Sequence, residues 1–311
     1  MRIIDFLIQL DKAIAISFYA DHQLAIFNGE ELIESPSRRP MGIAFTEGGM
    51  AVASKYGIDY YKKIHLAEDN QLFYRQTITK YMGRVDAHEL VSSKNGLIFA
   101  NTLFSCASVP EFSRDFAIAY KPSFINEPKP EDHSHLNGLA IVDGKLRFIT
   151  CFLAEDNDGR KSWGNKPNQG CLWDIVTEQP VIENIALPHS PRFYDRSVYV
   201  CESGKGSVLV RTEDTLAIVG LNSFTRGLIV TDDYLLVGTS KIREAAKNKS
   251  LHREYLKTNK CGIHLIERRS LELVDSYYFE NKREIFDIQL CERKTSIVTA
   301  DSKIFNFLHF L

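Results

Sequence analysis

A two-strand unit that recurs along the chain constrains its fold more than any other sequence feature. Each unit consists of an apolar stretch, a short turn, a second apolar stretch, and a small or polar residue near its end. The six units occupy residues 42–54, 89–101, 138–150, 192–203, 227–239 and 287–301. Their starts lie 47, 49, 54, 35 and 60 residues apart. A repeat of about 40 to 50 residues in a strand-rich chain is typical of β-propeller blades.

The residues between these units supply two further strands for each predicted blade. Stretches such as GIDYYKK, TLAIVGL and LELVDSYYF follow the hairpins, whereas amphipathic stretches of helical period are scarce. We therefore predict an all-β fold, a six-bladed β-propeller that forms a single domain over residues 1–311. The N-terminal segment at residues 14–34 would complete the last blade and remove an exposed sheet edge. A pair of β-sandwiches is the alternative architecture.

Composition limits the partners and the cellular setting. The 38 Lys and Arg residues balance 40 Asp and Glu residues, and the net charge of −2 argues against a strongly basic nucleic-acid binder. No stretch reaches the roughly 18 to 20 apolar residues that cross a bilayer. Asp5 and Asp11 interrupt the apolar N-terminus, which lacks a signal-peptide cleavage pattern, and the six cysteines form no CxxC pair. We expect a cytoplasmic protein that binds neither nucleic acid nor a membrane.

Histidines recur near the start of three consecutive repeats. The first strand of a propeller blade is innermost, so residues just before it line one mouth of the central channel. His88, His135 and His189 occupy this position. Three convergent imidazoles suit one divalent metal, with Glu89 or Asn137 as an oxygen ligand. Without a metal, the histidines and Glu89 would act as general acids or bases, since the usual pKa of His is near 6.5.

Arginines and other polar residues surround these histidines. Arg192 and Arg226 open inner strands, where a cation needs either an anionic ligand or a carboxylate of the protein. Internal pairing with Asp86, Glu202 or Asp287 is therefore the alternative to ligand binding. The predicted ligand-binding residues are Arg192, Arg226, Asn137, Asn101, Trp163, Arg243 and Glu202.

Long connections lead to the same mouth. Residues 153–170 include Trp163, which would stack on a sugar ring, and residues 240–260 are basic and include Arg243. Another connection brings Cys106 near the mouth as a candidate nucleophile, with a buried unreactive thiol as the alternative. No GxSxG elbow, P-loop, GxGxxG or EF-hand motif is present. Polar residues at a channel mouth can also bind only water and neighbouring strand ends.

Seven short motifs resemble, in order and character, a family of uncharacterised bacterial proteins known only by a domain of unknown function. They are DAHEL, NTLFSC, HLNGLA, LPHSPR, ESGKGS, FTRGL and VGTSKIRE, between about residues 84 and 245. More distantly, the blade pattern is similar to the six-bladed propellers of the regucalcin, gluconolactonase and strictosidine synthase group. Lactonases of that group hold a divalent cation through Glu, Asn and Asp, whereas this chain offers mainly His. Channel histidines look more like the metal sites of propeller polysaccharide lyases.

Together these features predict an enzyme that acts on a small anionic or sugar-like ligand at the channel mouth. The chemistry would be metal-assisted or histidine-based, in a hydrolase or a lyase. A non-catalytic module that binds a ligand or a peptide at the same mouth is the alternative function. A structural interaction propeller is a third.

Overall fold

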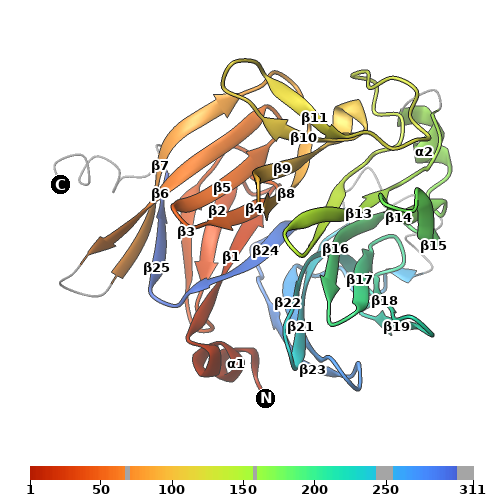
Figure 1. The fold of residues 1–311 in the computed structure, drawn as a ribbon. Helices are drawn as coiled ribbons and strands as arrows, with labels where there is room; N and C mark the ends of the chain where they lie inside the picture. Colours follow the sequence, from red (N-terminus) through yellow and green to blue (C-terminus); the bar gives the residue numbers. More distant parts are fainter. Residues whose placement is uncertain (67–70, 157–159, 243–254, 300–311) are drawn as a thin grey trace.

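The chain forms six sheets arranged in a ring, which is a six-bladed β-propeller (Figure 1). The computed structural model describes residues 1–66, 71–156, 160–242 and 255–299. The predicted all-β, six-bladed fold is confirmed. Each blade has one innermost strand, and each of these contacts the next to close the ring. The innermost strands of blades 1 to 6 are β4 (Ile43–Thr46), β8 (Ala87–Ser93), β12 (Gly138–Val142), β16 (Pro188–Tyr194), β20 (Phe224–Val230) and β24 (Ile285–Glu292).

Three further strands follow outward in each blade. Blades 1 and 2 add β5 (Gly49–Ser54), β6 (Gly57–Leu66) and β7 (Gln71–Tyr81), and β9 (Gly96–Asn101), β10 (Cys106–Pro110) and β11 (Phe116–Tyr120). Blades 3 and 4 add β13 (Lys145–Cys151), β14 (Gly170–Asp174) and β15 (Gln179–Ile185), and β17 (Ser197–Glu202), β18 (Ser207–Arg211) and β19 (Leu216–Gly220). Blade 5 adds β21 (Tyr234–Ser240), β22 (Gly262–Glu267) and β23 (Leu273–Tyr278). A 3₁₀ turn (Thr102–Phe104) and helix α2 (Arg160–Asn165) lie in connections between strands.

The last blade combines the two ends of the chain. Strand β1 (Lys12–Phe18) pairs antiparallel with β24, and β2 (Gln23–Phe27) and β3 (Leu32–Pro36) follow outward. The structure therefore confirms that the N-terminal segment closes the last blade. Pairing with β1 covers the outer edge of β24, which would otherwise be exposed.

The predicted hairpin at residues 287–301 is wrong. Its second strand, β25 (Thr295–Val298), does not return beside β24 but pairs in parallel with β7, at the outer edge of blade 1 (Figure 1). The reason is that β1 already occupies the edge of β24 where β25 would pair. The sequence pattern records an apolar strand but not which sheet edge remains open to it.

Apolar side chains pack between neighbouring blades rather than in one central core. Between blades 1 and 2, for example, Ala53 and Ile58 pack against Leu90 and Phe99. Because side chains alternate between the faces of a strand, each blade can present one apolar face to each neighbour. The strand interiors consequently read as apolar runs, which made the repeat visible in the sequence.

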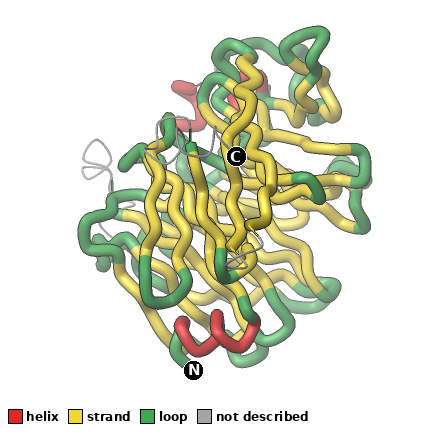
Figure 2. Tube along the Cα trace, turned by 90° about the vertical axis from the view of Figure 1, so that its left-hand side faces the viewer, coloured by secondary structure: helices red, strands yellow, loops and turns green. Residues whose placement is uncertain are grey.

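Helix α1 (Ile3–Leu10) covers the end of the ring that lies away from the starts of the inner strands. It buries Ile3, Phe6 and Leu7 against the apolar cluster between blades 5 and 6. Figure 2 shows the helix lying across the lower ends of the strands. No helix within the described ranges is long and apolar enough to cross a membrane.

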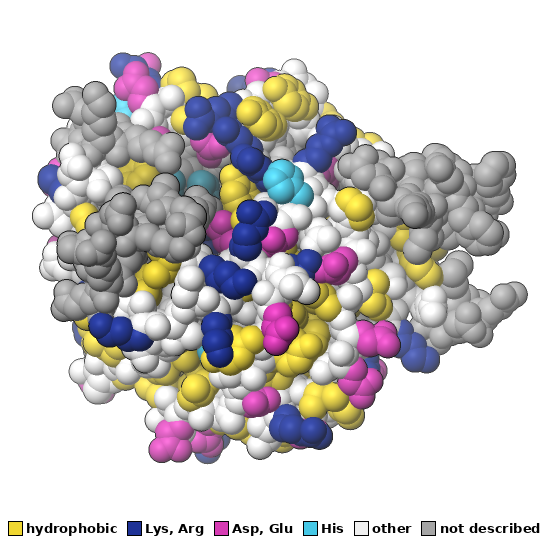
Figure 3. Space-filling model, turned by 180° about the vertical axis from the view of Figure 1, so that it is seen from behind, with side chains coloured by type: hydrophobic (Ala, Val, Ile, Leu, Met, Phe, Trp, Pro, Cys, Tyr) yellow, Lys and Arg dark blue, Asp and Glu magenta, His cyan; other side chains and the backbone are white. Residues whose placement is uncertain are grey.

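Charged side chains of both signs share the face shown in Figure 3. Lys and Arg lie across its centre, with Asp and Glu among them. This mixture agrees with the nearly balanced charge of the sequence. The face shown therefore carries no continuous surface of one sign.

Candidate functional site

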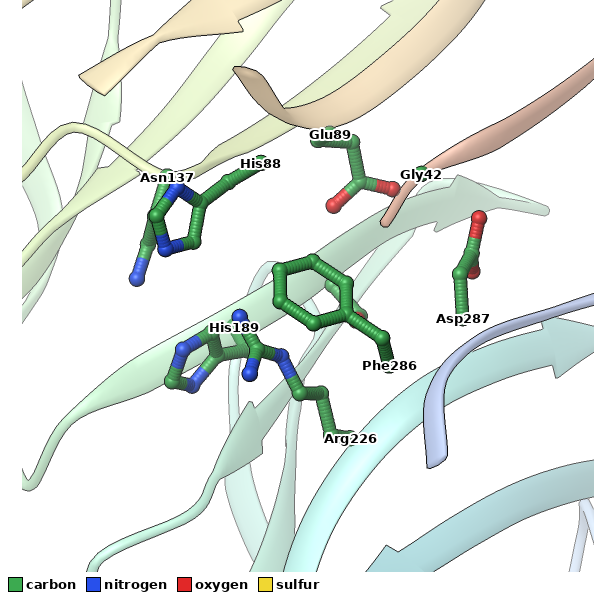
Figure 4. Close-up of a pocket in the computed structure, with 9 residues that line it drawn as sticks. Gly42, His88, Glu89, Asn137, His189, Arg226, Phe286 and Asp287 are labelled. Atoms are coloured by element: carbon green, nitrogen blue, oxygen red, sulfur yellow. The ribbon is translucent and has the colours of Figure 1, made fainter. Parts of the chain in front are cut away.

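A small pocket lies at the centre of the ring, where the inner strands begin. Every blade contributes to it, either from its inner strand or from the residue just before that strand (Figure 4). The lining residues are Gly42, His88, Glu89, Asn137, His189, Ser190, Arg226, Phe286 and Asp287. The free volume is about 10 Å³, roughly the space that one water molecule needs. The pocket thus matches the predicted position of the site but is much smaller than a sugar.

Breaks in strand register coincide with the pocket in three blades. Pairing is interrupted between Ala87 and Leu90 in β8, His189 and Arg192 in β16, and Thr225 and Leu228 in β20. A β-bulge inserts an extra residue, changes the direction of side chains, and is common next to active sites. The pocket residues inside these breaks are His88, Glu89, Ser190 and Arg226. The sequence pattern did not reveal the bulges.

The hydrogen bonds of His88 determine its tautomer. Its Nδ1 lies 2.8 Å from the carbonyl oxygen of Asp86 and 2.9 Å from Oγ1 of Thr102. The Thr102 hydroxyl donates its own hydrogen to the carbonyl oxygen of Leu136, at 2.6 Å. Nδ1 must therefore carry a proton and donate it. In the neutral ring, Nε2 is then the basic nitrogen.

His189 repeats this arrangement two blades further on. Its Nδ1 lies 3.0 Å from the carbonyl oxygen of Leu187 and 2.8 Å from Oγ of Ser203, which donates to the carbonyl oxygen of Thr225 at 2.5 Å. In both blades the hydroxyl follows the histidine by 14 residues. Nε2 is again the basic nitrogen. The same pair of hydrogen-bond partners, a backbone carbonyl and a hydroxyl, thus fixes an imidazole in blade 2 and in blade 4.

The backbone takes a left-handed conformation beside both histidines. Asp86 and Leu187, whose carbonyl oxygens accept from the two histidines, have φ values of 48° and 51°. Asp tolerates this conformation, whereas for Leu it is uncommon and costs about 1 to 3 kcal/mol. Such strain persists where the surrounding structure enforces it, and it is concentrated at functional sites. The strain at Leu187 therefore agrees with a functional role for His189.

His135 stands beside His88 rather than in the pocket lining. The two ring centroids are 4.9 Å apart, and Nδ1 of His135 lies 3.0 Å from each carboxylate oxygen of Asp132. The rings of Phe152 and Trp163 lie 4.3 Å from the His135 ring. Trp163 also donates from Nε1 to the carbonyl oxygen of Asp132, at 3.0 Å. In this structure Trp163 packs against His135 with the two rings tilted by 41°, and its predicted stacking on a sugar stays a prediction.

Arg226 brings a buried positive charge to the pocket. Its guanidinium carbon lies 3.3 Å from the centroid of the Phe286 ring, and Nη1 lies 3.4 Å from Oε1 of Glu284. Burial lowers the pKa of His189 well below its usual value, and the positive charge of Arg226 lowers it further. His189 is therefore a neutral imidazole at neutral pH.

Arg192 pairs with carboxylates of the protein. Its Nη1 donates to Oε1 of Glu89 at 2.6 Å, and its Nη2 lies 3.5 Å from Oδ1 of Asp287. Nε donates to the carbonyl oxygen of Leu228 at 2.9 Å. The guanidinium does not line the pocket. Of the two roles considered for Arg192, the structure thus has the internal salt bridge.

Glu89 belongs to this ion pair and also lines the pocket. Burial raises the pKa of Glu89 to about 7; the positive charge of Arg192 opposes this shift and the negative charge of Asp287 adds to it. Burial also raises the pKa of Asp287, against the charge of Arg192. Two carboxyl groups share one guanidinium here, so Glu89 is able to hold or release a proton near neutral pH.

The remaining predicted residues divide between the pocket and the blades. Asn137 lines the pocket, where its Oδ1 accepts from Thr150 at 2.8 Å. Asn101 donates to Ser108 within blade 2. The carboxylate of Glu202 accepts from the backbone N–H of Ala186 and from Ser207 and pairs with Lys205. Asn101 and Glu202 therefore contact neighbouring protein groups outside the pocket lining. Arg243 lies outside the described residues.

A nucleophilic role for Cys106 finds little support in this geometry, because the thiol is buried. Burial raises the pKa of Cys106 to about 11, so its thiol is protonated at neutral pH and is a weak nucleophile. Within the ranges that the structure describes, no group of three His, Cys, Asp or Glu side chains is arranged to hold a metal ion. A metal held by His88, His135 and His189 stays a prediction.

Comparison with known proteins identifies the family. The profile of a domain of unknown function, DUF4915, matches residues 1–298. The chain is a member of the DUF4915 family. This confirms the resemblance seen in the seven motifs. None of the curated proteins matches the chain.

Solved structures share the fold of this DUF4915 protein at low sequence identity. A chain of the Nidogen/Laminin complex is 9% identical with a TM-score of 0.60, and a protein of unknown function from Bacteroides caccae is 12% identical with a TM-score of 0.58. Each match covers 90% of this chain and 98% of the other. A putative 6-phosphogluconolactonase from Bacteroides uniformis is 12% identical with a TM-score of 0.48, over 88% of this chain and 84% of its own. These similarities concern the fold alone.

Proposed function

We propose that this DUF4915 protein is an enzyme that binds a small anion with an adjacent hydroxyl group, such as a hydroxy acid or sugar acid, and transfers a proton. One observation carries the proposal. Arg226 and the two fixed imidazoles of His88 and His189 line one pocket at the centre of the ring. A guanidinium binds a carboxylate or phosphate, while a neutral Nε2 accepts a proton or hydrogen bond.

The roles follow from the charges of the groups. Arg226 holds the anionic group of the substrate by a charge-assisted contact. Nε2 of neutral His189 accepts a hydrogen bond from the adjacent hydroxyl or from a water molecule and orients it. Glu89, whose pKa is raised to about 7, returns or receives a proton in the same pocket. This division of roles serves either a hydrolase or a lyase.

Pocket size supports a small reacting group. The free volume of about 10 Å³ admits only a group of water size. A sugar acid would place its reacting end in the pocket while the rest of the molecule lies in the channel mouth. Side chains that line the pocket must move apart to admit anything larger.

The guanidinium beside His189 supports histidine-based chemistry over the metal-assisted alternative. Burial lowers the pKa of His189, and the positive charge of Arg226 lowers it further. A divalent cation bound to the same imidazole would be repelled by this guanidinium. Elemental analysis tests the metal directly: one equivalent of a transition metal, lost from a His88→Ala/His189→Ala double variant, would overturn the histidine-based mechanism.

Binding measurements test the anion site. Small hydroxy acids, sugar acids and lactones are screened by the shift in melting temperature, and hits are measured by calorimetry. Arg226→Gln should weaken the affinity for the anionic hits at least tenfold. Arg269→Gln, which changes an exposed arginine in the β22–β23 turn, is the matched control and should bind normally. Equal affinity in both variants would contradict the proposal. Binding that depends on Arg226 without turnover would indicate the non-catalytic module instead.

A further inference from the structure

Two of the six cysteines face each other next to the candidate site. Cys151 ends β13 and Cys171 lies in β14, directly opposite in the antiparallel pairing of these strands. Their Sγ atoms are 3.4 Å apart, and all six cysteines are free thiols. The residues are 20 positions apart in sequence, and no spacing motif marks them. Only the pairing of the two strands brings them together.

The backbone geometry suits a disulfide. Opposite residues in antiparallel strands have Cα atoms about 4.5 to 5.5 Å apart, and disulfides join Cα atoms about 4.4 to 6.8 Å apart. The Sγ atoms must approach from 3.4 Å to the bond length of about 2.0 Å. Side-chain rotation provides this movement, because the backbone spacing already lies in the required range.

A surface pocket borders Cys171, one of the two cysteines. Cys171 lines a pocket of about 370 Å³ together with Gln169 and Trp173, on the outer part of blade 3. Cys151 is fully buried behind it. A peroxide molecule is little larger than water, whose share of liquid volume is about 30 Å³. The pocket is therefore large enough to bring a peroxide to Cys171.

We propose that Cys151 and Cys171 form a reversible disulfide, with a peroxide or a low-molecular-weight disulfide as the oxidant. With hydrogen peroxide, the Cys171 sulfur attacks one peroxide oxygen, which gives a sulfenic acid and one water. The Cys151 sulfur then displaces the hydroxyl of the sulfenic acid and releases a second water. The two thiols lose two electrons, the peroxide gains them, and both thiol protons leave in the water molecules.

The environment of the pair predicts slow oxidation. The hydrogen bond with Cys171 and burial raise the pKa of the Cys151 thiol well above its usual value. Because the thiolate is the reacting form, the second step, in which the Cys151 sulfur displaces the hydroxyl of the sulfenic acid, is slow at neutral pH. Its rate rises about tenfold per pH unit below the pKa of Cys151. This rate profile distinguishes the pair from exposed reactive cysteines.

The proposed disulfide would lie where the connection between β13 and β14 begins and ends, and this connection reaches the candidate site. Cys151 precedes Phe152, whose ring centroid is 4.3 Å from that of His135 and 5.3 Å from that of His189. A disulfide would tie the two ends of the connection that carries Phe152 and Trp163. The proposal itself needs no substrate, so it stands or falls independently of the proposed function.

Thiol counting and peptide mapping test the pair. The native protein is treated with hydrogen peroxide or oxidised glutathione, denatured, and labelled with a maleimide; four of the six thiols should remain. Protease digestion should release one linked peptide that contains Cys151 and Cys171, and dithiothreitol should restore all six thiols. Six labelled thiols after a treatment that oxidises free glutathione, or a link between other cysteines or between two chains, would overturn the proposal.

Matched variants test whether the loss of free thiols is specific to Cys151 and Cys171. Cys151→Ser and Cys171→Ser should each abolish the linked peptide. Cys261→Ser removes a buried thiol in another blade and should leave the link intact. The wild-type peptide map decides the question even if one of the variants folds poorly.

Discussion

At the scale of single residues, the two arginines of the channel differ by what lies opposite them. Arg226 lines the pocket against Phe286, whereas Arg192 reaches Glu89 and Asp287 from other blades. The sequence places both arginines at the start of inner strands and treats them alike. In the structure both contact carboxylates: Arg226 lies 3.4 Å from Glu284, and Arg192 contacts Glu89 and Asp287 of other blades. Of the two, Arg226 is the one that also lines the pocket.

Removing the Arg192 side chain should strongly destabilise the fold. Arg192→Met leaves Glu89 and Asp287, whose side chains are only 6% and 4% exposed, without their shared cation. Breaking such a buried pair costs about 3 to 5 kcal/mol of unfolding free energy. Urea denaturation measures the loss. Adding Glu89→Gln should recover part of it, because one uncompensated carboxyl is removed.

A surface ion pair provides the control for that prediction. Arg114 pairs with Glu111 in solvent, and Arg114→Gln should leave the urea midpoint nearly unchanged. If Arg192→Met unfolded at the same urea concentration as the wild type, the buried network would not stabilise the fold.

At the scale of elements, the connections that cover the site are tied together by charge. His133, between β11 and β12, contacts Asp156, between β13 and α2, and also Glu131. Burial alone would lower the pKa of His133, but hydrogen bonds to these two carboxylates outweigh it and raise the pKa above the usual value. Burial likewise opposes the lowered pKa of Asp156, which results from its hydrogen bond with His133.

The sign of the pH dependence follows from these directions. A raised pKa of His133 in the folded state gives stability that is complete below the unfolded value, about 6.5, and is lost as the pH rises through the folded value. The wild type should therefore become less stable relative to His133→Gln above pH 6.5. Urea midpoints measured in steps of pH test this. Parallel profiles for the two proteins would show that the contact does not bind the connections together.

Individual strands could be predicted where a pattern of neighbouring residues marks them. Apolar runs separated by turns identified the two inner strands of most blades, because both faces of these strands are buried between blades and nearly every residue is buried. The bulges at His88 and Arg226 were not predicted, since an extra residue in a pairing leaves no fixed trace in one strand alone. Strand β25 was assigned to the wrong sheet for the same reason: its partner is chosen by which edge is open.

At the scale of the whole molecule, the ring depends on closure of blade 6. Ile16 in β1 is fully buried in the cluster that joins blades 5 and 6. Ile16→Asp would bury an uncompensated carboxylate in the closing strand and should abolish a single cooperative unfolding transition or lower its midpoint sharply. Ile218→Asp, at a 64% exposed position of edge strand β19, should change the midpoint little. Similar midpoints for both variants would contradict closure as the main support of the ring.

The sequence alone determined the fold class, the six blades, the N-terminal closure and the DUF4915 resemblance, because each rests on apolar periodicity or on motifs in series. It also placed His88, His189, Asn137 and Arg226 at one mouth, since blade register is local information. The tertiary structure decided that Arg192 is paired internally, that Trp163 packs against His135, and that Cys151 faces Cys171. The Arg192 contacts join different blades and depend on closure of the ring, whereas strand pairing within blade 3 sets the Cys151–Cys171 distance.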